Sequence, residues 1–225
     1  MKEKNNSYSG LFICLGMLYV TCLLVSNLIA GKMWAPYGTV VVPAAVMLFP
    51  ITYIMSDIFT EVYGFDRARL VIWAGFACNI LAVICYVITI DLPYPAYFLD
   101  QEAYAVVLGM TPRVLVASFI GYLFGEFSNS IVMSKLKVVT KGKKLWLRTI
   151  GSTVIGEALD SVLFITISFA GTMPAKQLGT MILFQYLFKL TFEVVLTPLT
   201  YRVIAYIKKK EDMDIYDYDH KYKIF

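Results

Sequence analysis

Long apolar runs recur along this chain of 225 residues, and they decide what it can fold into. Each run is about 20 residues long, the length of α-helix that crosses the hydrocarbon core of a bilayer. Only 16% of the residues are charged, whereas soluble domains carry about a quarter. The strands of a membrane β-barrel would alternate in segments of about ten residues, and these runs do not. The pattern predicts an all-α integral membrane protein.

Six transmembrane helices are expected, in one transmembrane domain over residues 1–225 with no separate soluble part. The first run lacks a small-residue cleavage site, which favours a retained span over a signal peptide. A short amphipathic piece is expected around 100–109, lying at the membrane interface. The charged, Tyr-rich tail from Lys208 is expected to be solvated. The predicted spans are 10–31, 40–63, 68–90, 113–134, 150–171 and 178–204.

Basic residues predict the orientation of the chain. Of the 20 Lys and Arg residues, 16 fall on one side of the predicted spans and 3 on the other, while Lys189 lies inside the last span. Cytoplasmic loops carry the Lys and Arg excess, so both termini are expected in the cytoplasm. Because this topology already explains the charges, no nucleic-acid partner is expected. Six spans also divide into three plus three, which allows an inverted repeat.

Polar side chains inside the apolar runs are the candidates for function. Charges are costly in a bilayer, so they face a bundle interior and often mark a substrate or ion path. Acids three or four residues apart share one helix face, and a common central cavity would keep all these faces out of lipid. The candidate substrate-binding residues are Asn27, Asp57, Glu126, Asn129, Glu157, Asp160, Gln185, Lys189 and Glu193.

Structural roles compete with functional ones at several of these positions. Lys189 could pair with Glu193 one turn along the same helix. Glu61 is expected at the gate or at a helix end, where it would cap the turn with Arg67. The asparagines could serve only as interhelical hydrogen-bond partners. The remaining acids outnumber the bases, so they are protonated or they await a ligand or a cation.

The chain lacks the sequence motifs of common enzyme classes. The chain has no GxSxG, HExxH or P-loop sequence and no histidine within the predicted spans. No enzyme activity, metal site or cofactor is therefore expected, since the single histidine is His220 in the tail. A carrier of a small polar solute remains. Carboxylates accept paired N–H donors from a guanine-like edge, and nearby aromatic rings such as Tyr53 could stack on a flat ring.

Five segments resemble one bacterial family. They read "SNLIAGK", "DIFTEVYG", "TPRVLVAS", "GEFSNSIVMSKLKVVTKGKKLWLRTIGST" and "GEALDS". They are similar to the queuosine-precursor transporters, the YhhQ-like branch of the putative vitamin uptake (VUT) family. The resemblance implies six helices in the bacterial inner membrane and uptake of 7-cyano-7-deazaguanine, 7-aminomethyl-7-deazaguanine or queuine. It also implies similarity to the substrate-binding subunits of energy-coupling-factor vitamin importers, without their ATPase module.

The resemblance suggests roles that agree with the polar pattern. The guanine edge and an aminomethyl cation would each meet a carboxylate, supplied by Glu126 and by Glu157 with Asp160. Asn27 and Asn129 would help, and Lys189 would meet the 6-carbonyl or neutralise Glu193. A vitamin-binding subunit of an ATP-driven importer and a general purine or cation carrier stay open as alternatives. Three further questions stay open: whether transport is coupled to protons or is facilitated diffusion, which deazaguanine is preferred, and whether the protein forms a homodimer packed through small residues.

Overall fold

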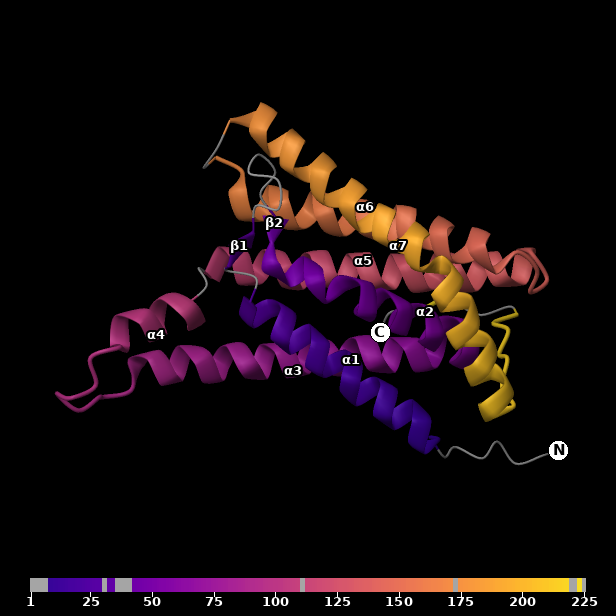
Figure 1. Ribbon diagram of the computed structural model, residues 1–225, viewed down its shortest axis with the longest axis horizontal. Coiled ribbons are helices and arrows are strands. Elements are labelled where there is room, and N and C mark those ends of the chain that lie inside the picture. Colours follow the sequence, from indigo (N-terminus) through magenta and orange to yellow (C-terminus); the bar gives the residue numbers. More distant parts are fainter. Residues whose placement is uncertain are drawn as a thin grey trace.

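The structure is a computed structural model that describes residues 8–29, 32–34, 42–109, 112–171, 174–218 and 222–223. His220 lies outside these ranges. The described part is almost entirely helical, with one short hairpin (Figure 1). Its elements are α1 (Gly10–Ile29), β1 (Met33–Trp34), β2 (Val42–Pro43), the 3-10 helix η1 (Ala44–Met47), α2 (Phe49–Tyr63), α3 (Phe65–Asp91), α4 (Gln101–Leu108), α5 (Pro112–Val139), α6 (Leu145–Phe169) and α7 (Ala175–Glu211).

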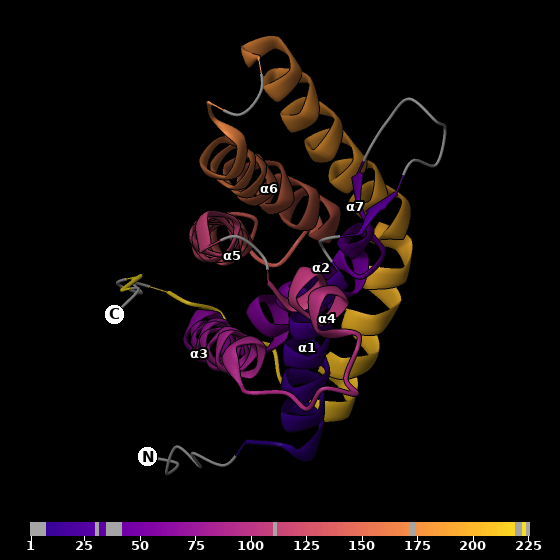
Figure 2. The same cartoon turned by 90° about the vertical axis from the view of Figure 1, so that its left-hand side faces the viewer.

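Five of the helices are long and apolar enough to cross a membrane. They are α1, α3, α5 from residue 116 onward, α6 and α7. Figures 1 and 2 show them as an elongated bundle, with α7 lying obliquely across the others. Most residues in these helices are not buried against other parts of the chain, as expected where lipid covers the outside. The predicted class, a helical membrane protein, is confirmed.

The predicted span 40–63 is wrong as a single helix. The residues of this span that the structure describes, from 42 onward, form β2, η1 and the 15-residue helix α2. Proline is the cause, because it lacks the N–H that a helix interior needs but is tolerated in a first turn. Pro50 therefore stands in the first turn of α2, and Pro43 is left in the hairpin, paired with Met33. At about 1.5 Å per residue, α2 alone is about 22 Å long, shorter than the hydrocarbon core.

α2 and α3 meet at a turn that requires glycine. Gly64 has φ of +83°, in the left-handed region, and its N–H donates to the carbonyl of Thr60 at 3.2 Å. Only glycine adopts this conformation without strain. A Cβ at this position would also lie 2.8 Å from Ile215 Cγ2. The turn therefore fixes α2 against α3 and leaves room for the chain after α7.

α5 and α6 approach each other closely through glycines. A Cβ on Gly125 would lie 2.9 Å from the Cβ of Asp160, and one on Gly156 would lie 2.9 Å from the Cβ of Asn129. Small residues at such crossings let helix backbones come together in a membrane. The crossing therefore sets Asn129 and Asp160, two of the predicted site residues, at the interface of α5 and α6.

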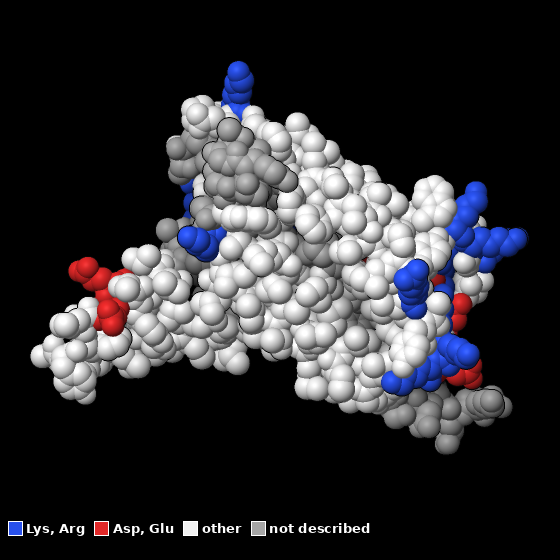
Figure 3. All heavy atoms as spheres, in the orientation of Figure 1, with Lys and Arg blue, Asp and Glu red and all other residues white. Residues whose placement is uncertain are grey.

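The two ends of the bundle differ in charge. Lys and Arg side chains gather at the end where α7 finishes, which we call the basic end (Figure 3). Acidic side chains stand at the opposite end, beside α4. The predicted short helix around 100–109 is confirmed as α4, which packs against α3. The charge segregation agrees with the asymmetry counted from the sequence.

Candidate functional site

A cavity of about 100 Å³ lies among the helices, bordered by α1, η1, α2, α3, α5, α6 and α7. Six of the nine predicted substrate-binding residues line it: Asn27, Glu126, Glu157, Asp160, Gln185 and Lys189. Its other polar and aromatic lining residues are Ser26, Thr52, Tyr53, Asn79, Ser118, Phe119, Tyr122 and Phe164. Sequence reasoning missed Thr52, Ser118, Phe119, Tyr122 and Phe164, because aromatic residues and single hydroxyl residues within an apolar run are typical of ordinary packing.

An ion-pair triad stands on one side of the cavity. Lys189 Nζ of α7 lies 2.8 Å from Glu157 Oε2 and 2.5 Å from Asp160 Oδ2, both on α6. The Lys189 side chain is almost fully buried, and its ammonium also lies 5.7 Å from the centre of the Tyr53 ring. The predicted pair of Lys189 with Glu193 is not among the ion pairs of the described residues. Lys189 instead links α7 to α6, because the carboxylates facing it across the cavity are closer partners.

Glu126 supplies the third carboxylate of the cavity. Its Oε2 accepts a hydrogen bond of 2.5 Å from Ser56 Oγ of α2. No Lys or Arg of the described residues forms an ion pair with it. Glu126 is 9% exposed, so it is shielded from solvent on the protein side. The cavity thus holds three carboxyl groups and one ammonium group, which favours ligands that bring N–H donors or a positive charge.

Amides complete the cavity wall. Asn27 Nδ2 of α1 donates to Asn79 Oδ1 of α3, and Asn79 Nδ2 donates to the Gly75 carbonyl at 2.9 Å. Asn27 therefore both joins two helices and lines the cavity. Gln185 is 6% exposed, and its Oε1 has no hydrogen-bond partner among the described residues. An unpartnered buried acceptor is costly, so this oxygen is available to a donor on a ligand.

Three predicted residues do not line the cavity. Asp57, Asn129 and Glu193 are all buried, at 1%, 8% and 2% exposure. Asn129 Nδ2 donates to Asp57 Oδ1 at 3.3 Å. They lie about one helical turn beyond the cavity toward the basic end, because each follows a cavity residue by three or four positions. They do not line this cavity, so their direct contact with a substrate stays a prediction.

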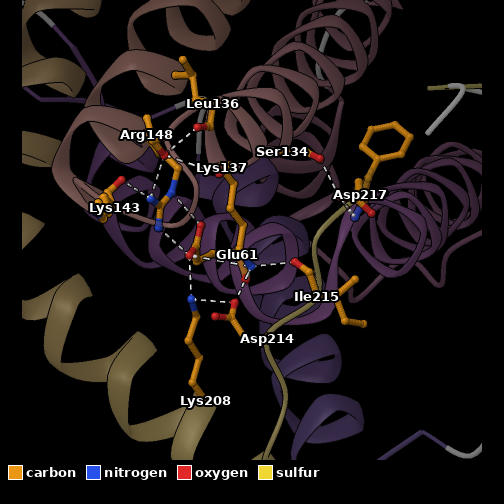
Figure 4. Close-up of polar contacts among 12 residues, drawn as sticks. Glu61, Ser134, Leu136, Lys137, Lys143, Arg148, Lys208, Asp214, Ile215 and Asp217 are labelled. Carbon is orange, nitrogen blue, oxygen red and sulfur yellow. Dashed lines mark hydrogen bonds and ion pairs between the residues drawn. The ribbon is translucent and has the colours of Figure 1, made fainter. Parts of the chain in front are cut away.

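Glu61 is the centre of an ion cluster at the basic end (Figure 4). It is fully buried, and Arg148 donates to both of its carboxylate oxygens, at 2.6 and 3.0 Å. Lys208 of α7 lies 2.7 Å from Oε1. Lys137 of α5 donates to the Glu61 backbone carbonyl. The cluster therefore ties α2, α5, α6 and α7 together.

Arg67 does not pair with Glu61, and this prediction was wrong. Its guanidinium lies 5.6 to 5.9 Å from the ring centres of Tyr8, Phe12 and Tyr63. It also donates to Met213 Sδ at 3.3 Å. Glu61 faces α5 and α6, whereas Arg67 faces α1. The true partner, Arg148 of α6, is 87 residues away from Glu61, and the sequence pattern, which places Arg148 in a basic loop, gives no sign of the pair.

The chain after α7 packs onto the bundle, so the prediction of a solvated tail was wrong for residues 213–217 and 222. Ile215 N donates to the Val62 carbonyl at 3.2 Å. Asp217 Oδ2 accepts from Phe65 N at 3.1 Å, at the start of α3 (Figure 4). Partial burial raises the pKa of Asp214, but the hydrogen bonds and charges of Lys137 and Lys208 outweigh it, and the net pKa is below its usual range.

Comparisons with known proteins agree with this architecture. The family described as "Putative vitamin uptake transporter" matches residues 43–203. The chain is 27% identical over 204 residues to the "Probable queuosine precursor transporter" of Bacillus subtilis, covering 90% of this chain and 86% of that one. It is 26% identical over 159 residues to the "Queuosine precursor transporter" of Escherichia coli, covering 69% of each. A Haemophilus influenzae relative, "Probable queuosine precursor transporter", is 25% identical over 161 residues, covering 70% of this chain and 66% of that one. No solved structure matches.

The family match covers most of the chain, including every helix that borders the cavity except α1. Its members and the three relatives are transporters, not enzymes. With the apolar helices, they identify a multi-pass protein of the bacterial inner membrane. This chain belongs to the putative vitamin uptake transporter family.

Proposed function

We propose that this protein imports queuosine precursors, the 7-deazaguanines, and binds them in the cavity among the helices, beside the Lys189 triad. The observation that carries the proposal is the cavity's charge: three carboxyl groups, Glu126, Glu157 and Asp160, face one ammonium group. The names of the three relatives support the same class of substrate. Transport by a member of this family requires such a polar site within the bundle.

The Lys189 triad is complementary to one edge of a deazaguanine. That edge presents a carbonyl oxygen next to two N–H donors. Lys189 can donate to the carbonyl while Glu157, 2.8 Å away, accepts from the N–H groups. The pairing resembles the two parallel bonds that a carboxylate forms with a guanidinium. Asp160 keeps Lys189 charged and in place, because it holds the ammonium from the other side.

The opposite part of the cavity suits the 7-substituent. Glu126 forms no ion pair among the described residues, and its Oε2 accepts a hydrogen bond from Ser56. An aminomethyl cation on the ligand would form an ion pair with the Glu126 carboxylate. Tyr53, Phe119, Tyr122 and Phe164 supply flat walls for the ring system. Tyr122 is held in place by a 3.0 Å hydrogen bond from its hydroxyl to the Ile72 carbonyl.

Transport requires the helices to separate. The cavity of about 100 Å³ is smaller than the roughly 300–1,000 Å³ of pockets that enclose drug-sized ligands. The Asn27–Asn79 pair joins the helices on one side, and the Glu61 cluster joins them at the basic end. We propose that these two contacts open in turn, as in alternating access. Glu61 is then a gate residue and Arg67 a helix-end residue.

We also propose that η1 and α2 together form a sixth crossing. Four 3-10 residues and fifteen α-helical residues add up to about 30 Å, the thickness of the hydrocarbon core. The hairpin satisfies the backbone where the segment is broken, as membrane burial demands. With six crossings, the start of the first helix and the end of the last helix both lie on the cytoplasmic side, in a 3+3 arrangement like that of energy-coupling-factor binding subunits. A homodimer is allowed and no ATPase module is required.

Binding to purified protein tests the proposal. Queuine, 7-cyano-7-deazaguanine and 7-aminomethyl-7-deazaguanine should each raise the thermal unfolding temperature in detergent, and guanine should not. Glu157→Gln should abolish the shift, whereas Glu102→Gln on α4, outside the cavity, should keep it. A wild-type shift that persists unchanged in Glu157→Gln would remove Glu157 from the site. Equal stabilisation by guanine would favour a general purine carrier, and uptake that depends on an ATPase partner would favour a vitamin-binding subunit.

A further inference from the structure

A second polar group is buried beside the cavity, and neither the substrate nor the ion cluster uses it. It consists of Asp57 on α2, Asn129 on α5 and Glu193 on α7, which we call the inner carboxylate group. These residues are 1%, 8% and 2% exposed. Asn129 points at Asp57 and donates to its Oδ1 at 3.3 Å. The group lies between the cavity and the Glu61 cluster.

Helix geometry brings the two carboxyl groups together. α2 and α7 pack against each other and run in the same direction (Figure 1). They are in register at the cavity, where Lys189 Nζ lies 5.7 Å from the Tyr53 ring centre. Asp57 and Glu193 each follow by four residues, one turn further along the same faces. Glu193 is therefore close enough to act electrostatically on Asp57.

Each member of the group has an oxygen without a partner. Asp57 Oδ2, Asn129 Oδ1 and Glu193 Oε1 are buried and form no hydrogen bond among the described residues. Unpaired polar atoms inside a protein are costly, and charged ones far more so. Three buried acceptors without a donor, on neighbouring helices, indicate that a positively charged or donating species belongs at this group.

The neighbouring acids increase the need for a positive charge at this group. Glu61 and Glu126 are the other acids that act on Asp57, and Glu157 acts on Glu193. Lys189, one turn from Glu193 along α7, is engaged by Glu157 and Asp160. Two adjacent buried carboxylates cannot both ionise without a compensating cation. Aspartic proteases solve the same problem by sharing one proton between two carboxyl groups.

We infer that the inner carboxylate group binds the proton that drives transport. One proton on Asp57 or Glu193 removes the like-charge repulsion and supplies a donor for an unpaired oxygen. A metal ion fits less well, because hard cations take about six or more oxygen ligands and only three unpaired ones are present here. The proton is loaded when an anionic carboxylate becomes a neutral carboxylic acid, and it is released by the reverse step, so no other reactant is needed.

The same two helices connect the proton to the substrate. α2 and α7 carry Tyr53 and Lys189 at the cavity and Asp57 and Glu193 one turn below it. A loaded proton lets the two helices close, whereas its release leaves two carboxylates that push them apart. The occupied cavity and the loaded proton therefore favour one arrangement of α2 and α7. This coupling rests on the proposed import function; the proton site itself does not.

Transport into liposomes tests the coupling. Purified protein is reconstituted and given labelled 7-aminomethyl-7-deazaguanine outside at one pH unit more acidic than inside. One proton per substrate should drive about tenfold accumulation, since one unit corresponds to about 1.4 kcal/mol. Asp57→Asn should equilibrate the substrate without accumulating it. Thr60→Val, a matched control on the same helix and equally buried, should accumulate it like the wild type. Accumulation by Asp57→Asn, or accumulation driven by a sodium gradient instead, would overturn the inference.

A spectroscopic measurement separates this inference from the choice of substrate. Infrared spectra without any ligand should show a protonated-carboxyl band at neutral pH in the wild type and in Thr60→Val. The band should be weaker in the Asp57→Asn/Glu193→Gln double variant. If no deazaguanine enters the liposomes but the band difference is present, the proposed substrate fails and the proton site stands. An identical band in the double variant refutes the proton site, whatever the substrate.

Discussion

Glu61→Gln is expected to destabilise the bundle more than any exposed charge change. The Glu61 carboxylate is fully buried and contacts Arg148 at 2.6 Å and Lys208 at 2.7 Å. The substitution leaves the almost fully buried Arg148 guanidinium without an anion. Removing one partner of a buried ion pair costs about 3–5 kcal/mol. Asp214 still accepts from Lys137 and Lys208, so only Arg148 loses its charge partner, and we expect a cost near the lower limit.

Denaturant unfolding in detergent measures this cost. Asp66→Asn is the matched control, because Asp66 forms an exposed pair with Arg69 at 3.2 Å, and exposed pairs contribute about 0–1 kcal/mol. A double variant, Glu61→Met with Arg148→Met, should recover most of the loss, because no charge is then left buried alone. A loss for Glu61→Gln no larger than for Asp66→Asn would refute the reasoning.

Two further predictions concern the basic end and the α5–α6 crossing. The pKa of Asp214 is lowered in the folded protein. The contribution of Asp214 to holding the tail is therefore present above about pH 4, the ordinary Asp value, and is lost as the pH falls through the lowered folded value. Across that acidic window, hydrogen exchange at the Ile215 amide should accelerate relative to an unprotected amide at the same pH, and less so in Asp214→Asn. Gly156→Ala should cost about 1–3 kcal/mol, because the new Cβ meets the Asn129 Cβ at 2.9 Å, whereas Gly151→Ala meets only a flexible Leu136 methyl at 3.2 Å and should cost less in the same unfolding assay.

The sequence predicted the class of fold and most of the cavity for one reason. Polar residues are so costly within apolar runs that their helical spacing already shows which faces turn inward. Glu126, Glu157 and Lys189 follow this rule, and all three line the cavity. The same reasoning placed Asp57 and Glu193 in the cavity as well, because spacing along a helix gives a face but not a depth. One helical turn separates their group from the cavity.

Long-range partners were not predictable from the pattern. Arg148 was counted among the loop residues that set the topology, yet it is 1% exposed and bound to Glu61. Asp214 and Asp217 belong to a segment whose composition is typical of a solvated tail, yet both contact the bundle. Hydropathy also could not show that residues 40–63 break, since Pro50 is compatible with a kinked span as well as with a helix start. Each of these outcomes depends on contacts between distant segments.

Uptake of a deazaguanine by the reconstituted protein tests the central claim most directly. Liposomes containing the wild type should take up labelled 7-aminomethyl-7-deazaguanine faster than empty liposomes, and unlabelled queuine or 7-cyano-7-deazaguanine should compete while guanine should not. Glu157→Gln should reduce the rate to that of empty liposomes, and Glu102→Gln should not change it. Wild-type liposomes that take up none of the three compounds faster than empty ones would contradict the account.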